Sequence, residues 1–212
     1  MDDGQLAAAL RPFGESRMLP PAAYTSAEVF AWERRHFFGG GWTCAGHSAR
    51  LPAAGDQLAV ETGAGGAVIV RGEDGIIRAF ANTCRHRGHE LLPCDSVANH
   101  GAANHGGANH GAANRSSTVH AKAIVCPYHS WVYSLSGELR GAPGYRDLAA
   151  KDWSLRELPA AEWDGLIFVD GSGGAAGPLP LAKLDPLVAP YEPSRLVVAA
   201  THTYDAAANW KI

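Results

Sequence analysis

The sequence predicts a mainly β protein with flanking helices, of the α+β class, built around a small antiparallel β domain over roughly residues 42–170. Two observations carry this prediction. Short apolar runs recur along this stretch and are separated by glycine-containing turns, such as GAGG at 63–66 and GEDG at 72–75. A segment rich in helix formers precedes these runs, and a turn-rich segment with short helical patterns follows them.

The helical segment lies at 25–38, where the sequence is TSAEVFAWERRHFF. Thr25 and Glu28 have the spacing of a capping box, in which two side chains satisfy the free amides at a helix start. Glycines at 39–41 are expected to end the helix. We therefore expect residues 1–41 to form an N-terminal helical segment.

Several short runs in the central domain have the composition of β-strands. Two of them flank the turn GEDG, so the stretch 67–80 predicts a hairpin. The last run is apolar over most of its length, which indicates a buried strand. The runs are WTCAGH (42–47), DQLAV (56–60), AVIV (67–70), IIRAF (76–80), AIVC (123–126), WVYSL (131–135), ELR (138–140) and GLIFVD (165–170).

Beyond the β domain, GSGGAAGPLP at 171–180 predicts a flexible connector. A short helix near 181–189, a strand near 195–204 and the start of a helix at 206–212 are expected to follow. The sequence stops at NWKI, about one turn into that last helix, and a helix this short is not stable by itself. A sequence cut within this helix and a natural C-terminus are the two interpretations of this ending.

Composition and charge exclude several classes of protein. The net charge is -3 and the Lys and Arg residues are scattered, so no nucleic-acid partner is expected. No apolar run approaches the roughly 20 residues that span a bilayer, and MDDGQLAAALRPFGES does not resemble a signal peptide. The four cysteines are then expected to be thiolate ligands or free thiols of a cytoplasmic protein. They are Cys44, Cys84, Cys94 and Cys126.

A repeat of the NHGAA type fills residues 99–113. It could be a metal-binding tract that uses His100, His105 and His110, or a tolerated loop expansion whose histidines are incidental. We favour the second interpretation, because a five-residue spacing keeps no common face on a helix or a strand. Its Gly, Ala and Asn content buries little apolar surface. We expect a low-complexity insertion over about 95–121.

The candidate metal ligands lie on either side of this repeat, as Cys84-x-His86 and Cys126-x-x-His129. Two thiolate–imidazole pairs on facing loops could form a structural zinc site. They could equally hold a 2Fe–2S cluster, with two cysteines on one iron and two histidines on the other.

The residues that flank the two pairs favour the cluster. Arg87-Gly88 allows a tight turn whose backbone amides can approach bridging sulfides. Pro127 stiffens the second loop. Tyr128 and Trp131 can shield a cluster and leave the imidazole edges reachable, which a structural zinc site does not need.

NTCRHRGHELL at 82–92 and AIVCPYHSWVYSLSGELRGAPG at 123–144 resemble the two cluster-binding boxes of Rieske proteins. More narrowly, they are similar to the N-terminal domain of Rieske-type aromatic-ring-hydroxylating oxygenase α subunits. Within that family, the sequence most resembles the branch that acts on quaternary ammonium compounds such as choline and glycine betaine. The similarity continues through residues 24–56 and through WDGLIFVD at 163–170.

The resemblance implies that Cys84 and Cys126 bind the inner iron and that His86 and His129 bind the outer iron. Mixed ligation raises the reduction potential to roughly −150 to +300 mV, against about −400 mV for plant-type clusters. The implied function is to accept one electron from a reductase or ferredoxin and to pass it to a mononuclear non-heme Fe(II). In this family the electron crosses between neighbouring subunits of a trimer.

Two departures from the family pattern matter. The 39 residues 87–125 separate His86 from Cys126, whereas the family's ligand pairs lie much closer. Loop closure costs only about 0.6 kcal/mol more for each doubling of length, so this need not abolish the site. The Asp-x2-His-x4-His pattern of the mononuclear iron site is absent. We expect that iron only in a full-length protein, and no turnover by this chain alone.

Two alternatives remain open. One is a stand-alone Rieske-type ferredoxin, although such a carrier would need neither the N-terminal helix nor the connector. The other is a zinc-stabilised interaction module. His89 and Cys94 lie outside the expected ligand set, and Cys44 and His47 are expected to be ordinary strand residues.

Overall fold

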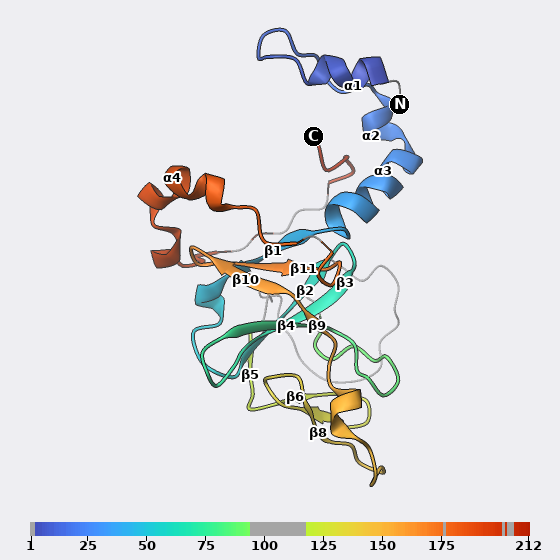
Figure 1. Ribbon diagram of the computed structural model, residues 1–212, viewed down its shortest axis with the longest axis vertical. Helices are drawn as coiled ribbons and strands as arrows, with labels where there is room; N and C mark the ends of the chain where they lie inside the picture. The colour runs from blue at the N-terminus through green and yellow to red at the C-terminus, as the bar shows by residue number, and fades with distance from the viewer. Residues whose placement is uncertain (1–2, 94–117, 176, 201, 203–205) are drawn as a thin grey trace.

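The computed structural model describes residues 3–93, 118–175, 177–200, 202 and 206–212 (Figure 1). Among these residues, no helix has the length and apolar character that crossing a bilayer requires. The strands are β1 Trp42–His47, β2 Asp56–Thr62, β3 Gly65–Arg71, β4 Ile77–Ala81, β5 Val119–His120, β6 Ile124–Val125, β7 Val132–Tyr133, β8 Leu139–Gly141, β9 Glu157–Leu158, β10 Ala160–Trp163 and β11 Leu166–Asp170.

These strands form three antiparallel sheets. The central sheet has the order β5-β2-β3-β4-β9, and two smaller sheets have the orders β1-β11-β10 and β6-β7-β8. Figure 1 shows the N-terminal helices at one end of the molecule and the β6-β7-β8 sheet at the other end. The predicted class, mainly β with flanking helices, is confirmed.

Strand β3 separates two apolar cores and contributes side chains to both. Its side chains alternate between faces, so Val68 and Val70 pack into one core while Ala67 and Ile69 pack into the other. All four are fully buried, which explains why this run is apolar without alternation. Burying a Val or Ile side chain contributes about 1.5–3 kcal/mol, so this strand stabilises both halves of the domain.

The hairpin expected at 67–80 is present. Strands β3 and β4 pair in antiparallel register, with Val68 opposite Phe80. The turn closes through a hydrogen bond from the Gly72 amide to the Ile76 carbonyl, 2.9 Å long. Arg78 and Asp74 form a 2.7 Å ion pair across its exposed face.

The N-terminal segment departs from the expected single helix. It contains α1 Asp3–Ala9, α2 Ala22–Thr25, α3 Ala27–Glu33 and a π-helical turn η1 at Arg34–Phe38. The assignment of Thr25 as the helix cap is wrong, because Thr25 ends α2 and its hydroxyl donates to the Pro21 carbonyl. Ser26 is extended and its hydroxyl accepts the Val29 amide, so Ser26 caps α3.

The C-terminal segment also differs from its prediction. The expected helix near 181–189 is split into short turns around α4 at Asp185–Val188, namely η4 Ala182–Leu184, η5 Ala189–Tyr191 and η6 Pro193–Arg195. The strand expected near 195–204 is wrong for the described residues 196–200 and 202, which are exposed and pair with no sheet. The helix expected at 206–212 is absent from the described residues there, which form bends and a turn, and the Trp210 side chain contacts α3.

The NWKI segment is held by one buried carboxylate on α3. Glu33 accepts hydrogen bonds from Lys211 Nζ at 2.8 and 2.9 Å and from Trp210 Nε1 at 3.0 Å. The hydrogen bond from Lys211, helped by that from Trp210, lowers the pKa of Glu33 against the opposing effect of burial. Asn209 adds a 3.1 Å hydrogen bond to the Tyr24 carbonyl. Together these contacts join the two ends of the chain.

We expect Glu33→Gln to lower the free energy of unfolding by about 1–3 kcal/mol, because it leaves the partly buried Lys211 ammonium without its carboxylate. The folded-state pKa of Glu33 lies below its ordinary value of 4.5. Its stabilisation is therefore complete above that value and is lost as pH falls through the folded pKa. Urea denaturation at pH 7 and pH 4 measures both effects. Glu28→Gln, exposed on the same helix, is the control, and an equal loss in both variants would contradict the role of Glu33.

Candidate metal centre

The first candidate loop is a tight turn that begins at Cys84. The Cys84 carbonyl accepts the Gly88 amide at 2.9 Å, and the Cys84 amide donates to the His89 carbonyl at 2.8 Å. Gly88 has a φ of 71°, which glycine adopts without strain. The turn therefore needs a residue such as glycine at its fifth position, and it carries Arg87 on its exposed side.

The second loop repeats this turn from Cys126. Its carbonyl accepts the Ser130 amide at 3.0 Å, and its amide donates to the Trp131 carbonyl at 2.8 Å. Ser130 occupies the position that Gly88 holds in the first loop and has a φ of 56°, a conformation uncommon for a residue with a Cβ. Pro127 lies exposed at the second position. Two segments far apart in sequence thus have the same local geometry.

Both cysteine side chains point into one apolar core. Cys84 and Cys126 are each 2% exposed and belong to the cluster that contains Val68, Val70 and Tyr133. Burial raises the pKa of the Cys84 thiol, and the adjacent Cys126 thiol raises it further, against the lowering effect of the Tyr133 hydroxyl. Two thiols held together in a dry core are suited to bind metal as thiolates, since the metal supplies the compensating positive charge.

Tyr133, which sequence reasoning missed, contacts the Cys84 sulfur. Its hydroxyl oxygen lies 3.3 Å from Cys84 Sγ and accepts the Arg85 amide at 3.1 Å. Burial raises the pKa of Tyr133, so the hydroxyl stays protonated. In the sequence Tyr133 is one more aromatic residue of a strand-like run, and no spacing rule marks it as a neighbour of the first loop.

The imidazoles of the two loops face each other outside this core. The His86 and His129 ring centroids are 4.9 Å apart. His86 stacks on Trp131 at an interplanar angle of 1°, and Tyr128 lies over His129 with its ring centroid 3.7 Å away. Burial, reinforced by the neighbouring His129, lowers the pKa of His86. The lowered pKa favours the neutral imidazole of His86, which is the form that binds a metal.

The residues present fit a 2Fe–2S cluster. His129 Nδ1 and Trp131 Nε1 are buried and have no hydrogen-bond partner among the residues that the structure describes. Leaving such an atom unpaired costs about 1–3 kcal/mol, and iron would be a partner for the imidazole nitrogen. Within the described ranges no three His, Cys, Asp or Glu side chains converge as a single-ion site. A cluster with two protein ligands on each iron needs no such convergence.

The other cysteines and histidines lie elsewhere. Cys44 is exposed in β1, and His47 is buried with its Nε2 2.8 Å from the Pro193 carbonyl. The ring of His89 lies beside Tyr128, and its Nδ1 lies 2.7 Å from the Glu90 carbonyl. Residues outside the described ranges include Cys94, the NHGAA repeat at 99–113 and its histidines.

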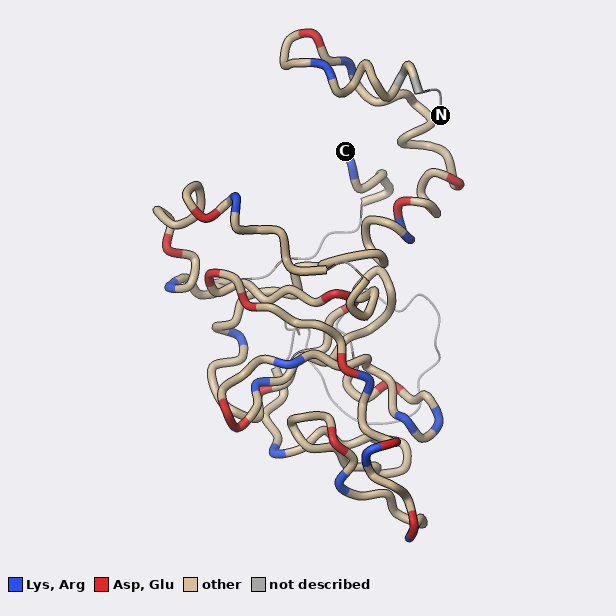
Figure 2. The backbone as a smooth tube through the Cα atoms, viewed as in Figure 1, with Lys and Arg blue, Asp and Glu red and all other residues tan. Residues whose placement is uncertain are grey.

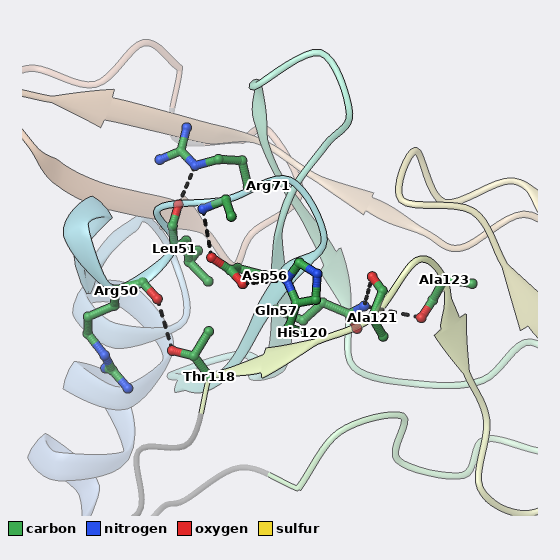
Figure 3. A network of polar contacts seen from close by, with 10 residues as sticks. Arg50, Leu51, Asp56, Gln57, Arg71, Thr118, His120, Ala121 and Ala123 are labelled. Carbon is green, nitrogen blue, oxygen red and sulfur yellow. Dashed lines mark hydrogen bonds and ion pairs between the residues drawn. The ribbon is translucent and has the colours of Figure 1, made fainter.

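A polar network fixes the chain that enters the second loop (Figure 3). The Gln57 amide donates to the carbonyls of Ala121 and Ala123 at 3.3 and 3.1 Å. Asp56 binds His120 Nδ1 at 2.9 Å, and the Ala53 amide donates to its other oxygen at 2.7 Å. Burial would raise the pKa of Asp56, but these two partners outweigh it and the pKa is lowered. Val119 and His120, expected to lie in the insertion, therefore belong to the central sheet as strand β5.

Comparison with known families gives a match over residues 41–153 to the Rieske [2Fe-2S] domain. The chain belongs to the Rieske [2Fe-2S] domain family. This match covers both candidate loops and strands β1 to β8.

Relatives extend the likeness beyond this Rieske domain. The chain is 33% identical to the glycine betaine monooxygenase oxygenase subunit of Chromohalobacter salexigens over 92% of its own length and 39% of the relative's. It is 30% identical to the carnitine monooxygenase oxygenase subunit of Escherichia coli K12 over 93% and 48%. The resemblance to Rieske oxygenase subunits is confirmed. The chain spans less than half the length of these two relatives.

Solved structures agree with the Rieske oxygenase fold. The apo form of the quaternary ammonium Rieske monooxygenase CntA has a TM-score of 0.72 and 27% identity, over 92% of this chain and 52% of that chain. A naphthalene 1,2-dioxygenase variant bound to phenanthrene has a TM-score of 0.61 and 29% identity, over 78% and 34%.

We expect deletion of 99–113 to leave iron loading of the chain unchanged or improved. Gln57 fixes the chain before the second loop at Ala121 and Ala123, and Thr118 donates to the Arg50 carbonyl. A shorter connection is also slightly cheaper to close. The measurement is iron and acid-labile sulfide per chain after reconstitution. Gln57→Leu, which removes the anchoring amide, should lower cluster retention in the same assay. Loss of the cluster on deletion would show that the repeat has a structural role.

Proposed function

We propose that this chain is the electron-transfer part of a Rieske oxygenase, with a 2Fe–2S cluster held by Cys84, His86, Cys126 and His129. The observation that carries the proposal is the arrangement of the two loops. Their identical turns set two buried thiols side by side and two imidazoles outside them, one with a buried and unpaired Nδ1.

The two cysteines and the two histidines would bind different irons of the cluster. The thiolates of Cys84 and Cys126 would hold the inner iron in a core that excludes water. The imidazoles of His86 and His129 would hold the outer iron and present its edge to a partner. When bound, the cluster supplies a one-electron carrier, whose potential is raised by histidine ligation. Trp131 and Tyr128 pack over the imidazoles and restrict their orientation.

The whole oxygenase would take electrons from a reductase or ferredoxin and pass them to a mononuclear iron outside this chain. Its substrate class would be quaternary ammonium compounds, since the relatives named above act on glycine betaine and carnitine. The reported structure of a quaternary ammonium Rieske monooxygenase gives insights into inter-subunit electron transfer, which supports an oligomer. We propose a homotrimer for the whole oxygenase from the resemblance to Rieske oxygenases. Figure 2 shows acidic and basic residues interspersed along the described chain, with no block of one sign that would indicate a nucleic-acid partner.

The proposed division of the chain into domains follows from the resemblance to Rieske oxygenase subunits. Residues 42–170 would form the Rieske unit, with 1–41 preceding it as a helical segment and 171–180 as connector. Residues 181–212 would open a catalytic domain. The contacts of Glu33 with Trp210 and Lys211 support one structural unit over both ends. They, and similarity to oxygenase subunits over 92–93% of the chain, favour this function over a stand-alone ferredoxin.

The test is a potentiometric titration of the chain after anaerobic reconstitution with iron and sulfide. We expect a reversible one-electron midpoint within about −150 to +300 mV and a rhombic EPR signal on reduction. Cys84→Ser should lose the cluster, whereas Cys44→Ser, at an exposed cysteine of β1, should keep it. A colourless chain with one zinc and no iron, or a midpoint near −400 mV, would contradict the proposal.

A further inference from the structure

Tyr145 lies at the edge of the candidate centre, on the loop that follows β8. Its hydroxyl oxygen is 3.2 Å from His86 Nε2. The loop turns at this point, with the Tyr145 amide donating to the Ala142 carbonyl at 3.0 Å and Gly144 at a φ of 88°. Tyr145 is 49% exposed, so the hydrogen bond lies at the solvent-side edge of His86.

Aromatic packing holds Tyr145 in this place independently of the hydrogen bond. Its ring meets Trp131 edge-on, with centroids 5.7 Å apart at 79°, and meets His86 at 5.6 Å and 78°. Trp153 packs edge-on against Trp131, with the two ring centroids 5.5 Å apart. Since Trp131 is 1% exposed, these ring contacts hold Tyr145 against a buried side chain.

The direction of the hydrogen bond follows from the ligand role proposed for His86. Because Nε2 faces Tyr145, Nδ1 is the ring nitrogen left for iron. A neutral imidazole that ligates through Nδ1 carries its proton on Nε2. The Nε2–H therefore donates, and the Tyr145 oxygen accepts.

Tyr133 acts on the same candidate centre as a hydrogen-bond donor, whereas Tyr145 acts as an acceptor. Its oxygen already accepts the Arg85 amide, so its own proton is free to point at Cys84 Sγ, 3.3 Å away. A donor to a ligand sulfur stabilises negative charge and thus the reduced cluster. An acceptor from a ligand imidazole makes that imidazole more basic and thus stabilises the oxidised cluster.

We propose that Tyr145 is a positioning residue that orients the His86 ring and lowers the reduction potential through its hydroxyl oxygen. The proposal rests on the proposed cluster ligation and adds a residue that neither the cluster boxes nor the fold assigns. Tyr145 and Tyr133 then shift the same one-electron couple in opposite directions.

The experiment compares three variants of the full chain, each reconstituted and titrated with dithionite through redox mediators. Tyr145→Phe keeps the ring and removes the acceptor, so the equilibrium constant for reduction should rise about two- to fivefold, or roughly 20–40 mV at 59 mV per tenfold. Tyr133→Phe should lower it. Tyr191→Phe is the control, because Tyr191 is 76% exposed and lies in the turn η5, outside the two loops. This variant should leave the equilibrium constant for reduction unchanged.

The outcomes separate the two proposals. An unchanged or lowered potential in Tyr145→Phe with full iron and sulfide would overturn the role of Tyr145 and leave the cluster assignment standing. Loss of the cluster in Tyr145→Phe, while Tyr191→Phe loads fully, would also overturn it, since the hydroxyl would then be a folding contact. An unmodified chain that takes up no cluster would overturn both.

Discussion

The structure depends on the burial of two cysteine side chains from distant segments in a single apolar core. Cys84 and Cys126 each pack against the face of the central sheet that carries Val68 and Val70. The sheet can offer this face because β3 is buried on both sides and is held rigid by β2 and β4. Once both cysteines are fixed there, the identical turns that follow them place both imidazoles outside the core.

This arrangement explains how the centre accommodates a long connection between its halves. The second half is positioned by its own contacts with β2, through the amide of Gln57 and the pairing of β5. The core on the same side adds Trp131 and Tyr133, which bridge the two loops by stacking on His86 and by contacting Cys84. Contacts with the central sheet thus determine where the two loops lie. The number of residues between the loops adds only a small entropic cost of closing the connection.

The sequence predicted those parts of the candidate centre that follow from residue type and short spacing. Cys-x-His and Cys-x-x-His can be recognised without a fold, and so can the alternating and apolar runs of the central sheet. Local competition decided the helix cap, where Ser26 replaced Thr25 because the preceding turn used Thr25. Long-range packing decided the rest. No local pattern could show that Tyr145 would reach His86 across 59 positions, or that residues 196–200 would find no strand to pair with.

The central claim is that two thiolates and two imidazoles, one of each from either loop, hold a single cluster. Pulsed EPR of the reduced, reconstituted chain with 15N-labelled histidine tests it most directly. The account predicts two distinct nitrogen couplings to the reduced cluster, with one lost from any variant of His86 or His129 that still binds iron. A reduced cluster without histidine nitrogen couplings would contradict it.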